Sequence, residues 1–194
     1  MIHLENFRTV YGAQFFAARM SELIWRDMYE LHTKEGINPN VFFSAIKDVE
    51  LEAAPNGTKT ATPFEREPLM GLWKKHYFTA SHLPGNLLKR KPRDDVVDAM
   101  IGAGGVTPTI ATIAAAITRN VVEMAANGKL TGDWIVFLPR AGTNYYLCCG
   151  KHNDDKQALL DRVINECTHD FPSLPVWVQE ARHTCAGRKA RSGR

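Results

Sequence analysis

The sequence has few cysteines, and their arrangement does not suit disulfide bonds. Only four occur in 194 residues. Cys148 and Cys149 are adjacent in a β-prone segment, where neighbouring side chains point to opposite faces. The first residues, Met1 to Asn6, have neither the basic nor the apolar stretch of a secretion signal. These features predict a cytoplasmic protein with reduced thiols.

Long apolar runs are also missing. The segment nearest to one, 101–117, contains three glycines, a proline and three threonines, and Arg119 follows it closely. A helix that spans a bilayer needs about twenty strongly apolar residues. No membrane association is therefore expected.

Neither sign of charge dominates, because 24 Lys and Arg residues against 21 Asp and Glu residues leave a net charge of +3. The basic residues are unevenly distributed, with clusters at 89–93 and 182–194. Such clusters allow a polyanionic partner without requiring one. A solvated basic connection is the plainer interpretation of 89–93, and its functional alternative is salt-sensitive affinity for a polyanion.

The hydrophobic periodicity predicts an α+β fold that is rich in helix. Apolar residues at helical spacing indicate helices over 11–35, 39–53, 108–127 and 153–167. The β-prone runs 134–138 and 145–149 predict a hairpin with a six-residue loop, and thus a small antiparallel sheet (134–149) near the C-terminus. Both faces of this hairpin are apolar, so elements should cover it on both sides.

One domain is expected over residues 1–181, followed by a basic, disordered tail at 182–194. Residues 176–178 fit a short edge strand. The helix ending near Asn127 is rich in alanine, and its small side chains suggest a central helix that neighbouring elements approach closely.

The segment 64–82 combines aromatic, basic and imidazole side chains. Its apolar residues fit a helix or a kinked helical turn, and it includes Lys75, His76 and His82. Two imidazoles beside a cation are what metal-independent RNA cleavage needs, because one group accepts the 2′-hydroxyl proton and the other protonates the leaving oxygen. The alternative is that His76 is a half-buried histidine among aromatics and His82 a cap beside a turn.

A second polar group lies at the loop and exit of the predicted hairpin. It contains Arg140, Asn144, Tyr146 and His152, with Thr143, Tyr145 and Lys151 between them. A sheet holds such side chains firmly while leaving them near solvent, which suits phosphate contacts. The alternative is an ordinary basic surface hairpin, and convergence of His76 with His152 would count against it.

Two weaker patterns point to other ligands. Cys149, His152, Cys167 and His169 could supply four zinc ligands, but they lack the paired tight spacing of zinc sites, and free cysteines are commonly core residues. The glycine-rich segment 102–108 precedes a helix, as in phosphate-binding loops, although a helix-to-helix turn explains it more simply. No metal or cofactor is predicted.

With its helical first two thirds and its late hairpin, the chain resembles the small RNases and toxins of the barnase, EndoU, colicin and RelE-like group, often found on mobile elements. The residues that carry this resemblance are His76, Asn144, Tyr146 and His152, within 64–174. The resemblance implies metal-independent RNA cleavage, with the sheet as the substrate platform and the histidines as acid and base.

Two functions of different classes follow. In the first, the protein engages nucleic acid, with RNA favoured, and cleaves it through His76 and His152, while Lys75, Arg140, Asn144 and Tyr146 bind substrate. This requires both imidazoles to reach one phosphate, so burial of either would argue against it. In the second, a non-catalytic accessory or regulatory protein of a bacterium or phage binds a protein or DNA through the Trp73–Phe78 surface.

Overall fold

The protein is described by a computed structural model that covers residues 3–52, 57–83 and 109–192. The basic run 89–93 and the glycine-rich segment 102–108 lie outside these ranges. The helices are α1 (Leu4–Tyr11), α2 (Glu22–Glu35), α3 (Asn40–Glu50), α6 (Ile110–Ala126), α7 (Lys156–Cys167) and α8 (Leu174–Ser192), with short 3-10 turns η1 (Ala17–Arg19) and η2 (Ala80–His82). The strands are β1 (Thr62–Pro63), β2 (Trp73–Tyr77), β3 (Asp133–Arg140) and β4 (Thr143–Gly150).

The four strands form one antiparallel sheet in the order β1-β2-β3-β4. A bulge lies opposite the Val136/Phe137 step, and because of it Leu147 and Cys148 both face the same side of the sheet. Cys149 faces the other side, as the sequence predicts for a strand. The predicted α+β class, helix-rich with a small antiparallel sheet, is confirmed.

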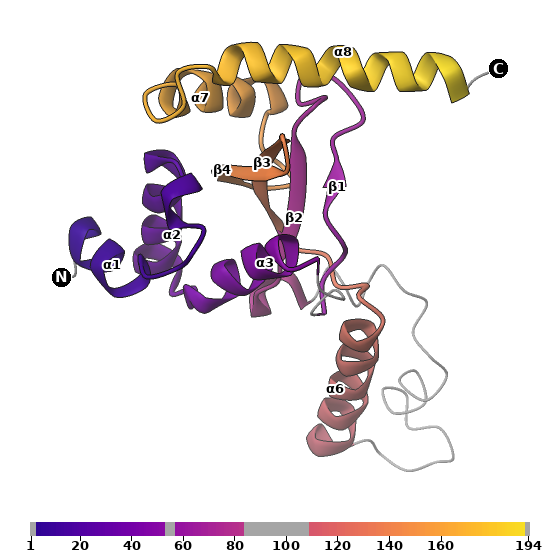
Figure 1. The fold of residues 1–194 in the computed structure, drawn as a ribbon. Helices are drawn as coiled ribbons and strands as arrows, with labels where there is room; N and C mark the ends of the chain where they lie inside the picture. Colours follow the sequence, from indigo (N-terminus) through magenta and orange to yellow (C-terminus); the bar gives the residue numbers. More distant parts are fainter. Residues whose placement is uncertain (1–2, 53–56, 84–108, 193–194) are drawn as a thin grey trace.

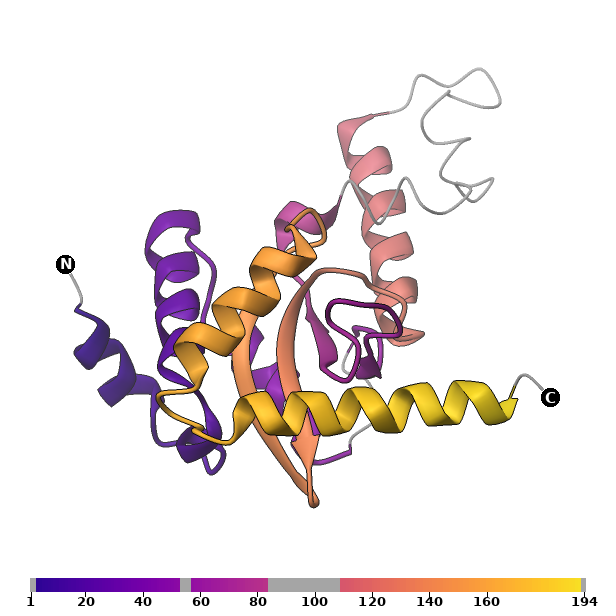
Figure 2. The ribbon, with the colours of Figure 1, turned by 90° about the horizontal axis from the view of Figure 1, so that it is seen from above.

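Helices cover both faces of the sheet (Figures 1 and 2). On one face, α2 and α3 cover the sheet in a core that includes Tyr77, Phe137 and Tyr146, and α1 packs on the outer side of α2. On the other face, α7 and α8 pack against Trp134, Val136 and Leu147. This arrangement confirms the coverage expected for a hairpin that is apolar on both sides.

The prediction of helix within 64–82 is wrong for its central part, because residues 73–77 form strand β2. Lys75 and Tyr77 point to the α2 side, whereas Lys74 and His76 point to the α7 side. This alternation comes from pairing with β3, in which His76 lies opposite Trp134. The aromatic residues suit a strand, and the tertiary contact decides between the two structures.

The hairpin is longer and its turn tighter than predicted. Its strands extend to Arg140 and Thr143, so only Ala141 and Gly142 form the turn. Both have positive φ, 49° and 75°, which is typical of the type I′ turn that matches the twist of antiparallel strands.

The predicted helix 11–35 is interrupted. Tyr11 ends α1, and α2 begins only after Ser21, whose Oγ accepts a hydrogen bond from the N–H of Ile24 at 3.1 Å. Ser21 is also buried against β4, where its N–H donates to Tyr146 O at 2.9 Å. This cap and the strand contact define the start of α2.

The C-terminal predictions also need correction. Residues 176–178 belong to α8 and not to an edge strand, and the segment expected to be a disordered tail continues that helix to Ser192. The helix is anchored to the loop before β2, because the guanidinium of Arg182 donates to Pro68 O and Met70 O. Leu174 and Val178 are buried against the sheet.

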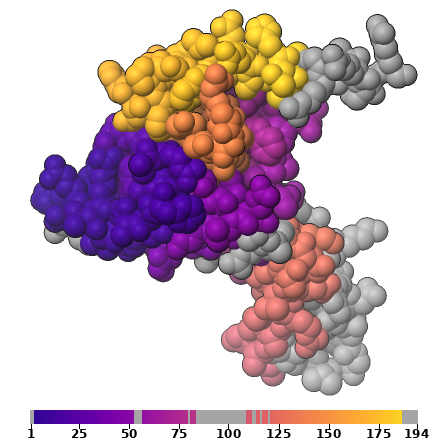
Figure 3. Space-filling view, in the orientation of Figure 1, coloured from indigo at the N-terminus to yellow at the C-terminus, as the bar shows by residue number. Residues whose placement is uncertain are grey.

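The alanine-rich helix α6 is not central. It projects away from the sheet and its covering helices, as Figures 1 to 3 show. Ile110 at its start is 88% exposed, whereas Met124 near its end is buried. No helix within the described ranges is both long and apolar enough to cross a membrane.

Candidate functional site

Trp134 of β3 is the centre of a basic and aromatic cluster on the α7 side of the sheet. The Nζ atoms of Lys74 and Lys156 lie 5.2 and 4.6 Å from the centroid of its indole ring. The rings of His152 and Phe64 approach it edge to face, with centroid distances of 4.6 and 5.3 Å. We call these five residues the Trp134 cluster.

Positive charge is concentrated at this cluster. Burial lowers the pKa of Lys74, and the neighbouring Lys59 and Lys156 lower it further, while Glu65 opposes the shift. A pocket of about 590 Å³ opens here, lined by residues 62–69 with Lys74, Trp134 and Lys156. Because the pKa of Lys74 is lowered by other cations, an anion in this pocket would relieve their repulsion.

Lys156 also positions His152. Its ammonium group donates to the carbonyl oxygens of Lys151, His152 and Asp154, at 3.3, 2.9 and 2.7 Å. The His152 Nε2 atom lies 3.1 Å from Gly132 O, and its side chain is exposed. The turn before α7 is thus held against Gly132, the residue that precedes β3.

His76 and His152 do come together, with ring centroids 5.7 Å apart and ring planes inclined by 30°. His76, however, is 5% exposed, and its Nε2 accepts a hydrogen bond from the indole N–H of Trp134 at 3.2 Å. A buried ring that is bound in this way does not reach a substrate phosphate. The proximity that the catalytic hypothesis needs is present, but the accessibility is not.

The charge state of His76 also argues against acid catalysis. Burial, followed by the nearby His152 and three lysines, lowers the pKa of its imidazole to about 3. The ring is therefore neutral near pH 7. Because an indole N–H can only donate, the proton of the neutral ring lies on Nδ1, which has no hydrogen-bond partner within the described part of the chain.

Lys75 is placed away from any substrate. It points to the opposite face of β2, is 1% exposed, and lies with its Nζ 3.1 Å from both Asp48 Oδ2 and Lys59 O. A lysine that is buried and paired in this way stabilises the junction of α3 with the sheet. Its expected role as a phosphate ligand finds no geometric support.

Asn144 and Tyr146 bind a protein carboxylate. Their side chains donate to Glu50 Oε1 at 3.1 and 2.6 Å, and Arg19 donates to both carboxylate oxygens, at 3.1 and 2.6 Å. Burial alone would raise the pKa of Glu50, but these hydrogen bonds outweigh it and hold the pKa below its usual value. The four residues form a satisfied structural network that joins η1, α3 and β4.

Arg140 lies at the opposite end of β3 from Trp134. Its guanidinium pairs with Glu180 and lies 5.2 Å from the ring centroid of Trp177, both on α8. The structure therefore does not bring Arg140 together with His76 and His152. Of the six predicted site residues, the two histidines meet on the α7 side of the sheet and Asn144 meets Tyr146 at Glu50, but the structure does not gather the six at one site.

The alternative Trp73–Phe78 surface is mostly internal. Lys75, His76 and Tyr77 are buried, and Trp73 and Phe78 are partly buried. A buried strand cannot present these side chains together to a partner.

The possible zinc ligands are separated by the sheet. Cys149 packs on the α2 face and Cys167 on the α7 face, where its Sγ lies 3.3 Å from Leu147 O. Within residues 3–52, 57–83 and 109–192, no three His, Cys, Asp or Glu side chains are grouped closely enough to hold a metal ion.

Sequence reasoning missed Trp134 and Lys156 as partners of His152. Phe64 and Lys74 belong to the segment 64–82, which the sequence marks as a candidate site, but nothing in their spacing connects them to α7. Comparisons with protein-family models, with curated proteins and with solved structures found no match. Function therefore has to be inferred from the residues and their geometry.

Proposed function

We propose that the protein binds nucleic acid, with RNA favoured, through the phosphates, and that the Trp134 cluster is the contact surface. The observation that carries the proposal is the placement of two lysine ammonium groups, from β2 and α7, against one indole ring at the edge of an open pocket. Lysine is a common phosphate ligand that acts as a point charge. Lys74 would donate to the phosphate, whereas Lys156, whose three N–H groups donate to carbonyl oxygens, would contribute its charge.

Other charges at the pocket support this proposal. Arg66 lines it with an exposed side chain. Of the two carboxylates that also line it, Glu67 lies 3.5 Å from Arg182, which reduces its repulsion of an anion. The basic run 89–93 would add affinity of the same kind.

Cleavage by His76 and His152 is not included in the proposal, because His76 is buried, neutral and bound to Trp134. A cytoplasmic setting is retained, since the cysteines at 148, 149, 167 and 185 are free thiols and RNA is abundant there.

The test is fluorescence anisotropy of labelled single-stranded RNA and DNA of about 20 nucleotides, titrated with the full chain in excess EDTA at several salt concentrations. Lys74→Gln should weaken binding and reduce the salt slope by about one unit. Lys47→Gln is the matched control, because Lys47 is exposed on α3, away from the Trp134 cluster.

If the protein bound neither RNA nor DNA, or if Lys74→Gln and Lys47→Gln changed the affinity equally, the proposal would be overturned, and a protein partner would be sought instead. The same samples, resolved on a denaturing gel, report cleavage. Cleavage that disappears in folded His76→Ala and His152→Ala variants would restore the catalytic hypothesis.

A further inference from the structure

The hydroxyl group of Tyr77 is buried without a hydrogen-bond partner in the described part of the chain. The side chain is 1% exposed and lies on the α2 face of β2, opposite in direction to His76. A buried hydroxyl that lacks a partner costs free energy, so a structure that retains one requires an explanation.

Tyr77 lines a polar pocket between α2, β4 and α7. The pocket has a volume of about 220 Å³ and is lined by Tyr77, Cys149, Gly150 and charged side chains from both helices and from the turn after β4. The groups that raise the pKa of Tyr77 after burial are Cys149, Asp133, Glu35 and Asp27. Three of these four residues line the pocket together with Tyr77 itself.

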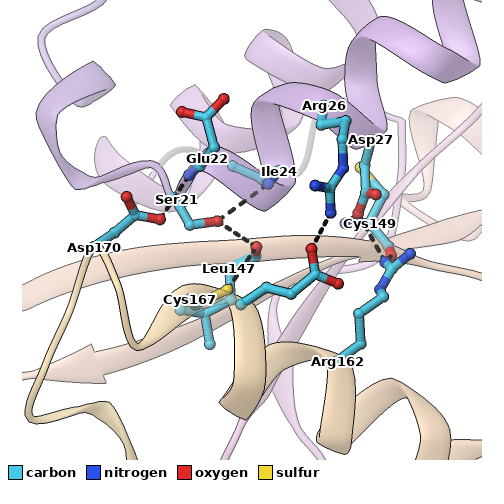
Figure 4. Close-up of polar contacts among 11 residues, drawn as sticks. Ser21, Glu22, Ile24, Arg26, Asp27, Leu147, Cys149, Arg162, Cys167 and Asp170 are labelled. Atoms are coloured by element: carbon cyan, nitrogen blue, oxygen red, sulfur yellow. Dashed lines mark hydrogen bonds and ion pairs between the residues drawn. The ribbon is translucent and has the colours of Figure 1, made fainter.

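Asp27 contributes a carboxylate of fixed orientation to the same pocket. The N–H of Cys149 and the guanidinium of Arg162 both donate to Oδ2, at 2.9 and 2.8 Å, as the contacts in Figure 4 show. Within the described chain, Oδ1 receives no hydrogen bond, and it is not among the buried atoms that lack one. The bonds to Oδ2 therefore fix the carboxylate and leave its other oxygen available.

The lining favours a cation over an anion. It contains four carboxylates, on Asp27, Glu30, Glu35 and Asp154, against three cations, on Lys34, Lys151 and Arg162. Each cation is already paired, Lys34 with Glu30, Lys151 with Glu35 and Arg162 with Asp27, at 2.8 Å in every case. These three pairs leave one carboxylate in excess, so the lining carries a net negative charge and favours an added cation over an added anion.

We propose that this pocket binds a small primary ammonium compound, whose N–H groups donate to the phenol oxygen of Tyr77 and to Oδ1 of Asp27. A volume of about 220 Å³ admits a short-chain amine or a small amino acid. The ammonium group is common to both, so the experiment includes one of each. Tyr77 lies on the opposite face of the sheet from Trp134, and the pocket lining includes no residue of the Trp134 cluster, so the proposal does not depend on nucleic-acid binding.

The test uses four ligands of matched length, added to the full chain: butylamine, butyrate, butanol and 2-aminobutyrate. Two-dimensional amide NMR and thermal unfolding detect binding. Butylamine should give saturable shifts at the amides around Cys149 and raise the melting temperature, whereas butyrate and butanol should do neither. Binding of 2-aminobutyrate would identify an amino acid as the class of ligand, and binding of butylamine alone a simple amine.

Tyr77→Phe is the discriminating variant, because it removes only the hydroxyl. It should weaken butylamine binding at least tenfold while leaving the melting temperature of the free protein equal or higher. Tyr145→Phe, on the other face of the sheet, should bind like the unaltered protein. Absence of saturable amine binding, or unchanged affinity in Tyr77→Phe, would overturn the proposal and leave the hydroxyl as a hydrated core group.

Discussion

Trp134 donates its indole N–H to Nε2 of His76 across 3.2 Å, and this bond fixes both the tautomer and the orientation of the imidazole. Protonation of His76 at Nε2 would break the bond and place a charge among buried aromatic groups. The histidine that appeared to be a catalytic acid in the sequence is thus a neutral part of the core, and this has a measurable effect on stability.

The first prediction concerns acid stability. The pKa of His76 falls from 6.5 to about 3 on folding, so the unfolded chain takes up a proton first as the pH decreases. The stabilisation is complete above pH 6.5 and is lost toward pH 3, at about 1.4 kcal/mol per pH unit. Urea unfolding should show that the stability difference between the unaltered protein and His76→Phe falls by about 2 kcal/mol between pH 7 and pH 5. A constant difference would contradict this account of His76.

Asp27 should have the opposite pH dependence. Burial raises the pKa of its carboxyl group from 3.8 to about 6, against the opposing effect of Arg162. Between these values the unfolded chain loses its proton first, so stability falls as the pH rises from 3.8 to 6 and is level above that range. Asp27→Asn removes this fall, which amounts to about 3 kcal/mol. Parallel pH profiles for the variant and the unaltered protein, in the same unfolding assay, would show that the assignment is wrong.

The Glu50 network should matter for stability and not for binding. Glu50→Gln exchanges an acceptor for an amide donor that faces Arg19, Asn144 and Tyr146, so we expect a loss of about 3 kcal/mol in the free energy of unfolding. Glu5→Gln, at an exposed position in α1, should change stability by less than about 0.5 kcal/mol. Equal effects of the two substitutions would mean that the network is not stabilising.

Substitution of Arg140 tests whether RNA binds at the Trp134 cluster alone or along a more general basic surface. Its guanidinium is paired with Glu180 at the far end of β3, so Arg140→Gln should leave the affinity for RNA and its salt slope unchanged. Anisotropy titrations beside Lys74→Gln provide the comparison. If Arg140→Gln weakened binding as much as Lys74→Gln, the contact surface would extend along the whole sheet.

The main architecture was predictable because its signals are local. The hairpin has dense β-prone runs, and α3 and α7 begin close to their predicted starts at 39 and 153. Strand β2 was not predictable, because its aromatic residues, together with Leu69 and Leu72 just before it, also fit helical spacing, and only pairing with β3 decides between strand and helix. The position of α6 could not be predicted from the sequence either, since small side chains permit close packing without requiring it.

The candidate site was predictable only in part. The sequence suggested that His76 and His152 could meet, and they do, but their environment depends on Trp134, which appeared to be an ordinary strand residue. Asn144 and Tyr146 carry groups suited to phosphate binding, yet Glu50, from a distant helix, occupies them. A polar side chain in a sequence does not reveal whether its partner is a substrate or another residue of the same chain.

The outer edge of β4 is closed by three side chains and by the backbone of Ser21. The N–H of Ser21 donates to Tyr146 O. As Figure 4 shows, the Ser21 hydroxyl donates to Leu147 O, Asp27 accepts the N–H of Cys149, and Arg162 donates to the Cys149 carbonyl. At the other edge, β1 ends in Pro63, which has no N–H to offer. Open edges allow sheets of separate molecules to join into aggregates. With these groups occupied, this sheet is poorly suited to recruit a further strand, so the protein should resist aggregation by edge-to-edge pairing even when concentrated.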